Sequence, residues 1–522
     1  MNRLRAGFFA LSLPILSLSY ACAPATEAAP EDGTTEDAFT VRDCVKEQAI
    51  ATDGYNELRE ADPALVTRKE LGANGELIAD DQKVVRPTTD QVQGAMKKIS
   101  QHLDQIEREV PDSIRRRETY SQSSRGKKPD PYCLFHAPGK AVYGTVILFH
   151  GYNDRPHQQA KLGSYLFHNG FNVYNVFLAN MYMVPGTDYW PKTTYKPEVL
   201  ATLQRKLAAP AVQTVIQPIL PRLQTGALTP EDVIAIDRIL SPELSTSTIK
   251  EAWSKPGGSA WNQLMASHEP TAGESLVDAA RQADFMAYVR DAAARIADLA
   301  DMPGPLFVSG LSVGGTVALA AGAAEGGRRI KGIVSHAPWL ASVDPKNNTQ
   351  LMIAGPLDAA IGAAGGQYPI EWESHKIKFS PASISATLAL GSWTAQPENV
   401  KTLARIPTAQ VITDDEDSAD NNASGKLQAA LTSDPRVADL HVRVAYPKEL
   451  HVRHAITDPE NYKDGDPAGP SWNKYWRTLY QESFRFYTTG AMKQENLLRK
   501  TPDPALPKPA CAMPDNPHRC GE

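Results

Sequence analysis

A serine stands between two glycines in Gly310-Leu311-Ser312-Val313-Gly314, where a strand-like apolar run gives way to small residues typical of a helix. A nucleophile on such a strand-to-helix turn has a strained backbone, and side chains two residues to either side would collide across the turn. We therefore expect Ser312 to be a nucleophile, with Gly310 and Gly314 leaving room for the turn. A serine hydroxyl is a poor nucleophile near neutral pH, so the chain must also supply a base, an orienting acid and donors for an oxyanion.

The oxyanion donors are expected at His150-Gly151-Tyr152, which directly follows an apolar run, Val142 to Phe149, predicted to be a buried strand. Here the sequence resembles the α/β-hydrolase family, and "VILFHGYNDRPHQQAKLGSYLFHNGFNVY" is most similar to its lipase, esterase and monoglyceride-lipase branch. The resemblance implies that His150 and Gly151 shape the turn and that the backbone N–H groups of Tyr152 and Val313 form the oxyanion hole. A plain strand-ending turn is the alternative.

The resemblance also implies an acid after Ser312 and a histidine after the acid. The strand-like run "TAQVIT" is followed by an acidic cluster, residues 414–420. In the family the acid lies several residues past the strand, which favours Asp417 as the residue that orients the base. Three neighbours remain open: Asp415, Glu416 and Asp420.

The base must come from the six histidines that follow Ser312, namely His336, His375, His441, His451, His454 and His518. The segment "LHVRHAIT" follows the last predicted strand, where the family keeps its base on a loop. His454 matches the family's V-x-H spacing with Val452 and is our prediction, with His451 as its close rival. His336 ends a predicted strand and is expected to pack in the core.

Strand and helix patterns alternate along most of the chain, which predicts a parallel sheet covered on both faces. With the resemblance, this gives an α/β-hydrolase fold with a mostly parallel central sheet. We expect its core at residues 116–184 and 276–490, and a helical cap insertion at 185–275. A mainly helical extension is predicted at 40–115 and a proline- and cysteine-containing tail at 491–522.

The cap is predicted to lie over Ser312, because it leaves the sheet at a strand's carboxyl end, where ligands bind in such folds. Its entry is rich in large apolar side chains that are candidates for an acyl pocket: Tyr182, Met183, Tyr189 and Trp190. The alternative is that these residues only pack the cap onto the core.

Residues 1–22 resemble an export signal, because positive charge precedes an apolar stretch, Phe8 to Leu18, that is too short to span a bilayer. Cys22 ends a segment that resembles a bacterial lipobox, although Ser19 stands where the family prefers Leu. We expect Cys22 to be lipidated and the acidic segment 23–39 to be a flexible tether, which predicts an exported, membrane-anchored lipoprotein in the periplasm or outer membrane. Cleavage of the signal without lipidation is the alternative.

Lipidation of Cys22 would leave an even set of cysteines that can form disulfides in three ways: Cys44, Cys133, Cys511 and Cys520. No short-spaced cysteine and histidine cluster suggests a metal, and the predicted chemistry needs no cofactor. The formal net charge of −6 gives no sign of a nucleic-acid partner.

These features together predict a serine hydrolase that cleaves a small-molecule carboxylic ester, with an apolar or lipid-like ester favoured. A serine peptidase or amidase of the same fold is one alternative. A catalytically inactive, surface-tethered binding protein is another.

Overall fold

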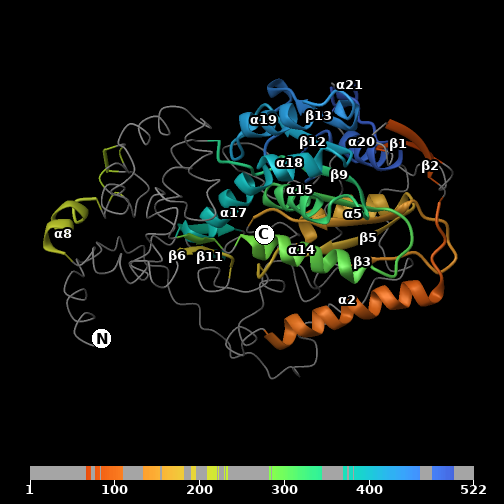
Figure 1. Cartoon of the computed structure of the whole chain (residues 1–522), viewed down its shortest axis with the longest axis horizontal. Coiled ribbons are helices and arrows are strands. Elements are labelled where there is room, and N and C mark those ends of the chain that lie inside the picture. Colours follow the sequence, from red (N-terminus) through yellow and green to blue (C-terminus); the bar gives the residue numbers. More distant parts are fainter. Residues whose placement is uncertain are drawn as a thin grey trace, which may run out of the picture. The chain divides into compact units, whose positions relative to one another are not determined.

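The computed structural model of the 522-residue chain is shown in Figure 1. It describes residues 66–71, 77–82, 84–109, 133–152, 154, 156–181, 190–195, 209–219, 222, 229, 231–232, 235, 281–283, 285–343, 368–372, 375–379, 381–458, 473–498 and 502. The predicted export signal and tether, Cys22, Cys44, Cys511 and Cys520 lie outside this set.

A seven-stranded sheet in the order β13-β12-β9-β8-β4-β5-β3 forms the centre of the molecule. Neighbouring strands are parallel except for the edge strand β3, which pairs antiparallel with β5. β4, β5, β8 and β12 are buried along their whole length because both faces of the sheet are covered. Their bounds are β3 Cys133–Leu134, β4 Gly144–Phe149, β5 Phe171–Val176, β8 Leu306–Leu311, β9 Ile330–His336, β12 Thr408–Thr413 and β13 His441–Tyr446.

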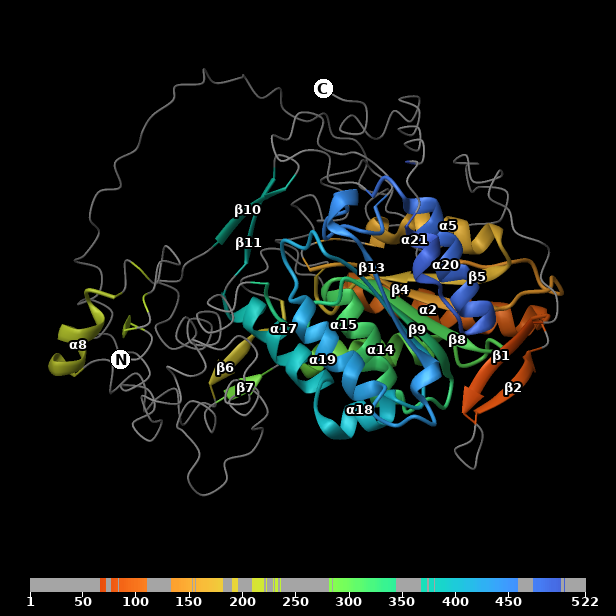
Figure 2. The same ribbon diagram turned by 90° about the horizontal axis from the view of Figure 1, so that it is seen from above.

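Helices cover both faces of the sheet, as Figure 2 shows. Successive strand residues point to opposite faces. In β4, Ile147 and Phe149 therefore join one core layer, and Val146 and Leu148 join the other. The first layer contains α14 Met286–Asp298, α15 Val313–Glu325, α17 Pro381–Thr394, α18 Pro397–Leu403 and α19 Asn421–Leu431. The second contains α5 Ala160–His168, α20 Trp476–Thr489 and α21 Gln494–Leu497.

The strand order reverses between β4 and β8. After β4 the chain forms α5 and then β5 on one side of β4, whereas β8 pairs with the other side. In open parallel sheets, the crevice at such a reversal, beyond the carboxyl ends of the strands, is where ligands bind. Because His150 follows β4 and Ser312 follows β8, the fold places both predicted segments at this crevice.

The N-terminal extension contains the predicted helix, α2 Thr89–Glu109, which buries Val92, Ala95 and Ile99 in the same core layer as α14. It also contains a β-hairpin that the sequence did not predict, with strands β1 Val66–Leu71 and β2 Leu77–Gln82. A β-bridge between Val85 and Val142 joins the extension to the start of β4.

Two strands bracket the insertion after β5. β6 Thr193–Tyr195 pairs antiparallel with β7 Arg281–Ala283, so the chain leaves and returns at one place. Between them the described part of the insertion includes the helix α8 Pro210–Ile216. A further hairpin after β9 consists of β10 Tyr368–Trp372 and β11 His375–Phe379.

Cys133 in β3 is buried, and the other cysteines lie outside the described residues, so the predicted disulfides stay a prediction. Within the described ranges, no helix is both long and apolar enough to cross a membrane.

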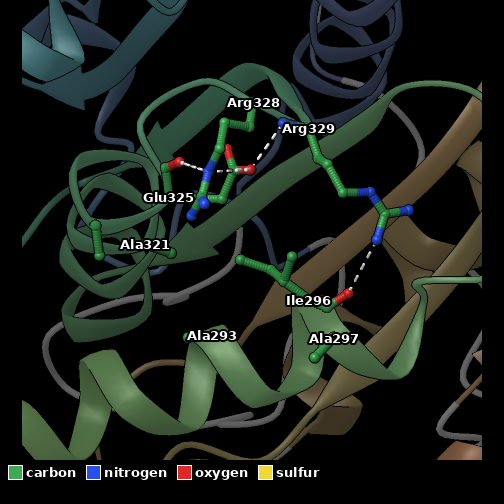
Figure 3. Close-up of a pocket in the computed structure, with 8 residues that line it drawn as sticks. Ala293, Ile296, Ala297, Ala321, Glu325, Arg328 and Arg329 are labelled. Atoms are coloured by element: carbon green, nitrogen blue, oxygen red, sulfur yellow. Dashed lines mark hydrogen bonds and ion pairs between the residues drawn. The ribbon is translucent and has the colours of Figure 1, made fainter.

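A hollow of about 320 Å³ lies between α14 and α15, and Figure 3 shows its walls. Small side chains, including Ala293, Ala297 and Ala321, line it and leave the space between the helices open. Glu325 and Arg328 lie at its edge, where the Arg328 Nε is 3.8 Å from a Glu325 carboxylate oxygen. Because α15 begins beside Ser312 and the hollow includes its last turn, the hollow lies far from the serine.

Candidate active site

Ser312 lies on a strained turn between β8 and α15, with φ 58° and ψ −123°, and is 7% exposed. Its N–H donates to the carbonyl oxygen of His336 at 2.9 Å, and its carbonyl oxygen accepts the N–H groups of Thr316 and Trp339 at 3.1 and 3.0 Å. A residue other than glycine in this region of backbone space is strained by roughly 1–3 kcal/mol. The surrounding hydrogen bonds hold the serine in this conformation.

The two glycines of the motif are required by close backbone contacts. A Cβ atom at Gly310 would overlap the carbonyl group of Gly314 across the turn. A Cβ atom at Gly314 would overlap the carbonyl oxygens of Phe149 and His150 at the end of β4. Gly314 therefore allows the serine turn to lie directly against the His150-Gly151 turn.

A strained serine turn after β8, beside the strand reversal of a mostly parallel seven-stranded sheet, decides the fold class. The chain has the α/β-hydrolase fold. The fold places the serine where these proteins hold a nucleophile, and the side chains around it must show what chemistry is available.

His150 fixes the orientation of the next peptide group. Its Nε2 accepts the backbone N–H of Leu178 at 3.0 Å, so the ring proton is on Nδ1, which donates to the carbonyl oxygen of Gly151 at 2.7 Å. In a trans peptide the N–H points away from the C=O. The Tyr152 N–H is therefore directed away from the His150 ring.

Gly151 brings this peptide next to the serine. A Cβ atom at Gly151 would lie 3.6 Å from the Cβ of Ser312, and the N–H of Gly151 donates to Oε1 of Gln158 at 2.6 Å. Val313 is the first residue of α15, where backbone N–H groups have no partner within the helix and the helix dipole favours negative charge. The two predicted oxyanion donors, Tyr152 and Val313, thus belong to turns that touch.

The carboxylate of Glu416 contacts His454, with Oε1 lying 2.7 Å from Nδ1 of the imidazole. The Glu416 side chain is 3% exposed and that of His454 is 18% exposed. Oε1 also accepts the backbone N–H groups of Ser418 and Ala419 at 2.9 and 3.0 Å. Burial raises the pKa of Glu416, but His454 and these N–H groups outweigh it, so the pKa is lowered and the carboxylate is ionised.

The structure brings Glu416, one residue earlier in the chain, to His454, and not the predicted Asp417. The Asp417 side chain is 52% exposed, and its carboxylate lies 4.0 Å from Arg453. Asp415 lies 3.6 Å from His451 on the surface, and Asp420 caps α19 by accepting the N–H of Asn422. The loop after β12 turns only Glu416 of these four acids inward to His454.

The other histidines of the described C-terminal half differ from His454 in their surroundings. The His451 side chain is 79% exposed, which removes the close rival from the interior of the site. His336 is fully buried at the end of β9, between Ser309 and Ser483, as predicted for a core residue. Burial lowers the pKa of His336 to about 3.

One loop connects the Ser312 turn with the loop that carries Glu416. Residues 337–343 follow β9, and within them the Trp339 N–H donates to the carbonyl oxygen of Ser312. Further along, the Val343 N–H donates to the Ser418 carbonyl oxygen at 2.7 Å, and the Asp420 N–H donates to the Ala341 carbonyl oxygen at 2.9 Å. Backbone hydrogen bonds of this loop thus link the Ser312 turn to the Glu416 loop.

Strained backbone is concentrated at this edge of the sheet. Among the described residues, the non-glycine positions with positive φ are Asn180, Ser312, Ala337 and His451. Each follows the carboxyl end of a sheet strand: β5, β8, β9 and β13, respectively. Strain of this kind gathers at functional sites.

Of the residues predicted to line a pocket, Trp190 is described. It is 1% exposed and packs edge-on against Tyr152, with ring centroids 5.3 Å apart. Tyr182, Met183 and Tyr189 lie outside the described residues. Trp190 therefore packs against the turn that carries the Tyr152 N–H, as in the alternative to the pocket prediction.

No protein-family model and no curated protein sequence matches the chain. Among solved structures, one of two metagenome-derived lipolytic enzymes has a TM-score of 0.35 and 13% identity, covering 69% of this chain and 98% of its own. A monoglyceride lipase from Saccharomyces cerevisiae has a TM-score of 0.34 and 14% identity, covering 66% and 86%. A monoacylglycerol lipase from Paleococcus ferrophilus has a TM-score of 0.34 and 13% identity, covering 66% and 93%. Similarity at this level does not extend to what the chain binds or cleaves.

Proposed function

We propose that this α/β-hydrolase-fold chain is a serine hydrolase that cleaves carboxylic esters through an acyl-enzyme on Ser312. The observation that carries the proposal is the strained Ser312 turn, packed against a peptide group whose N–H is oriented by His150. The Glu416–His454 pair at the same edge of the sheet supplies the acid and the base that a serine needs.

The pair defines which imidazole nitrogen is the base. Because the ionised carboxylate of Glu416 lies 2.7 Å from Nδ1 of His454, we assign the ring proton to Nδ1, which leaves the Nε2 lone pair available to accept a proton. As the Ser312 Oγ attacks the ester carbonyl carbon, its proton passes to Nε2 and negative charge develops on the former carbonyl oxygen. The imidazolium that forms is stabilised by the carboxylate of Glu416.

The N–H groups of Tyr152 and Val313 are assigned to the developing oxyanion. Donors that are already oriented need no rearrangement during the reaction, and loss of one such donor typically costs roughly 10²–10³-fold in kcat. When the tetrahedral intermediate collapses, the ester C–O bond breaks and Nε2 returns the proton to the leaving alkoxide. Water then attacks the acyl-enzyme by the same route and releases the carboxylic acid and free Ser312.

An apolar or lipid-like ester is the proposed substrate class. The partly exposed Tyr152 ring, which packs on the buried Trp190, offers an apolar surface beside the assigned oxyanion donors. We extend the proposal to location: export directed by residues 1–22 and lipidation of Cys22 would hold the enzyme at a membrane surface, where lipid-like esters are concentrated.

The test is a set of initial rates on p-nitrophenyl esters from acetate to palmitate, with the wild type, Ser312→Ala and His454→Ala side by side. Turnover that falls by roughly 10⁵–10⁶-fold in both variants is expected for residues that act as a unit. The preferred chain length then reports on the acyl pocket. Activity that survives in Ser312→Ala would overturn the mechanism.

A second set of substrates, p-nitroanilides with matched acyl groups, distinguishes ester from amide cleavage. Anilide turnover without ester turnover would replace the proposal with an amidase or peptidase. A wild type that turns over neither set, and whose Ser312 does not react with a fluorophosphonate, would be a binding protein.

A further inference from the structure

Thr413 connects the two loops that carry the acid and the base. It is the last residue of β12 and is fully buried. Its hydroxyl donates to the carbonyl oxygen of Val452 and accepts the N–H of Asp415 at 3.2 Å. Its own backbone carbonyl oxygen accepts a hydrogen bond from the side-chain amide of Asn421 at 2.7 Å. Both hydrogen-bonding functions of the hydroxyl are therefore used.

The two partners of this hydroxyl lie one and two residues before the members of the pair. Asp415 precedes Glu416, and Val452 lies two residues before His454. The parallel pairing of β12 with β13 ends where Thr413 faces Tyr446. The Thr413 hydroxyl continues the connection between the two chain segments beyond this point.

The pairing of β12 with β13 ends before His454, and the chain turns at His451 in between, so strand pairing alone does not position His454. His451 has φ 52°, which turns the backbone after β13, and Val452 then packs in the core with 1% exposure. The Val452 carbonyl oxygen accepts the hydrogen bond from the Thr413 hydroxyl. A shift of the 452–454 backbone relative to the 414–416 backbone would change the 2.7 Å separation of His454 Nδ1 and Glu416 Oε1.

We infer that the Thr413 hydroxyl is a positioning group that sets the separation of His454 and Glu416. The inference rests on the proposed function for its effect on turnover, although the geometry of the pair can be measured without a substrate. Thr413 touches neither ring nor carboxylate in this role, and it acts through the backbone of Val452 and Asp415.

Three substitutions separate the hydroxyl from the bulk of the side chain. Thr413→Val keeps the shape and removes the hydroxyl, whereas Thr413→Ser keeps the hydroxyl and removes a methyl group. Thr408→Val is the matched control, because Thr408 begins the same strand, is equally buried and donates its hydroxyl proton to a carbonyl oxygen, that of Ile406, at 2.8 Å. Thr408 lies at the end of β12 that is remote from the site.

For Thr413→Val we expect kcat to fall by roughly 10- to 100-fold, the effect of a small misplacement of reacting groups, with KM changed by about twofold at most. The rate of Ser312 labelling by a fluorophosphonate should fall in parallel. Thr413→Ser should restore both rates to within about threefold of the wild type. Thr408→Val should reduce thermal stability by as much as Thr413→Val while leaving both rates unchanged.

The pair itself is followed by the low-field proton resonance of His454 Nδ1–H, identified by its loss in His454→Ala. We expect it to shift or broaden in Thr413→Val and to remain in Thr413→Ser and Thr408→Val. If the wild type neither turns over esters nor labels, the proposed function fails, and this resonance still decides the role of Thr413. An unchanged resonance in Thr413→Val, equal losses in Thr413→Val and Thr413→Ser, or a wild type without the resonance would each overturn the inference.

Discussion

The two halves of the candidate site are built by different physical means. At the ends of β4 and β8, the turns of Gly151 and Ser312 meet through backbone contacts so close that a single added carbon at Gly314 would overlap two carbonyl groups. At the ends of β12 and β13, the loops that carry Glu416 and His454 are joined by the hydrogen bond from Thr413 to Val452 and by the contact of the Glu416 carboxylate with His454. The first half is fixed by close backbone contacts that leave no room for a side chain. The second half is fixed by contacts between polar groups.

This difference determines how each half should respond to mutation. Overlap with backbone atoms cannot be relieved by a change of side-chain rotamer. A substitution that adds atoms to the first half should therefore reduce the stability of the fold. Loss of a polar contact creates no overlap, so the fold can remain intact. A substitution that removes a polar group from the second half should therefore reduce activity more than stability.

Gly314→Ala should disrupt the close contact between the Ser312 turn and the His150-Gly151 turn. We expect a loss of stability on the order of 3 kcal/mol, because the new Cβ would meet the carbonyl oxygens of Phe149 and His150. Fluorophosphonate labelling of Ser312 should be abolished, since the serine turn can no longer lie against the His150-Gly151 turn. Urea denaturation and labelling of the same preparation measure both effects.

Gly425→Ala is the matched control. Gly425 lies inside α19, and a Cβ atom there would meet nothing within 4 Å. Alanine in a helix interior is favoured over glycine by roughly 0.5–1 kcal/mol, so this variant should be slightly more stable and fully labelled. A stable, normally labelled Gly314→Ala protein would contradict the steric account.

Glu416→Gln should disable the polar half without unfolding the protein. The amide oxygen can still accept the N–H groups of Ser418 and Ala419, but the carboxylate charge beside His454 is lost. We expect kcat to fall by roughly 10³–10⁴-fold, the effect of the corresponding change in serine hydrolases of other folds. Rates on the preferred ester, together with the thermal midpoint, test this.

Asp417→Asn distinguishes the structural assignment from the sequence prediction. Its side chain is 52% exposed, and removal of such a surface charge should change kcat by about twofold at most. If Asp417→Asn loses as much activity as Glu416→Gln, the loop adopts another arrangement during catalysis and Glu416 is not the acid.

The same contrast explains which parts of the molecule the sequence could predict. Close packing of backbones requires glycine at defined positions. Gly310 and Gly314 therefore indicate the turn at Ser312 from the sequence alone. Any of several acids in one loop can pair with a histidine, and the pattern of residues 414–420 does not record which one the loop turns inward. The sequence prediction chose Asp417, whereas the structure places the neighbouring Glu416 against His454.

The hairpin of β1 and β2 was missed for a related reason. It lies within the stretch 40–115, where the strong helical spacing of Val92, Met96 and Ile99 in α2 dominated the interpretation. A two-stranded hairpin leaves a weak signal in sequence because such a unit is marginal alone and depends on packing against other elements. The helix was predicted because its own periodicity specifies a buried face.

His336 lies between the two halves and should link their stability to pH. It ends β9, which pairs with β8 on one side and β12 on the other, and burial lowers the pKa of its imidazole to about 3. Between pH 6.5 and pH 3 the unfolded chain binds a proton at this residue that the folded chain does not, so stability falls as pH falls. The slope from this one residue is about 1.4 kcal/mol per pH unit.

His336→Asn should therefore lower stability at neutral pH, through loss of the contacts with Ser309 and Ser483, and flatten the dependence of stability on pH below 6.5. Urea unfolding at intervals from pH 7 to pH 4.5 measures the slope. His441→Asn is the comparison, because burial lowers the pKa of His441 to about 4 at the start of β13, away from Ser312. Both variants should flatten the curve over this range, since each removes an imidazole that the fold keeps neutral. A His336→Asn slope equal to that of the wild type would mean that the core at the end of β9 accommodates the protonated ring.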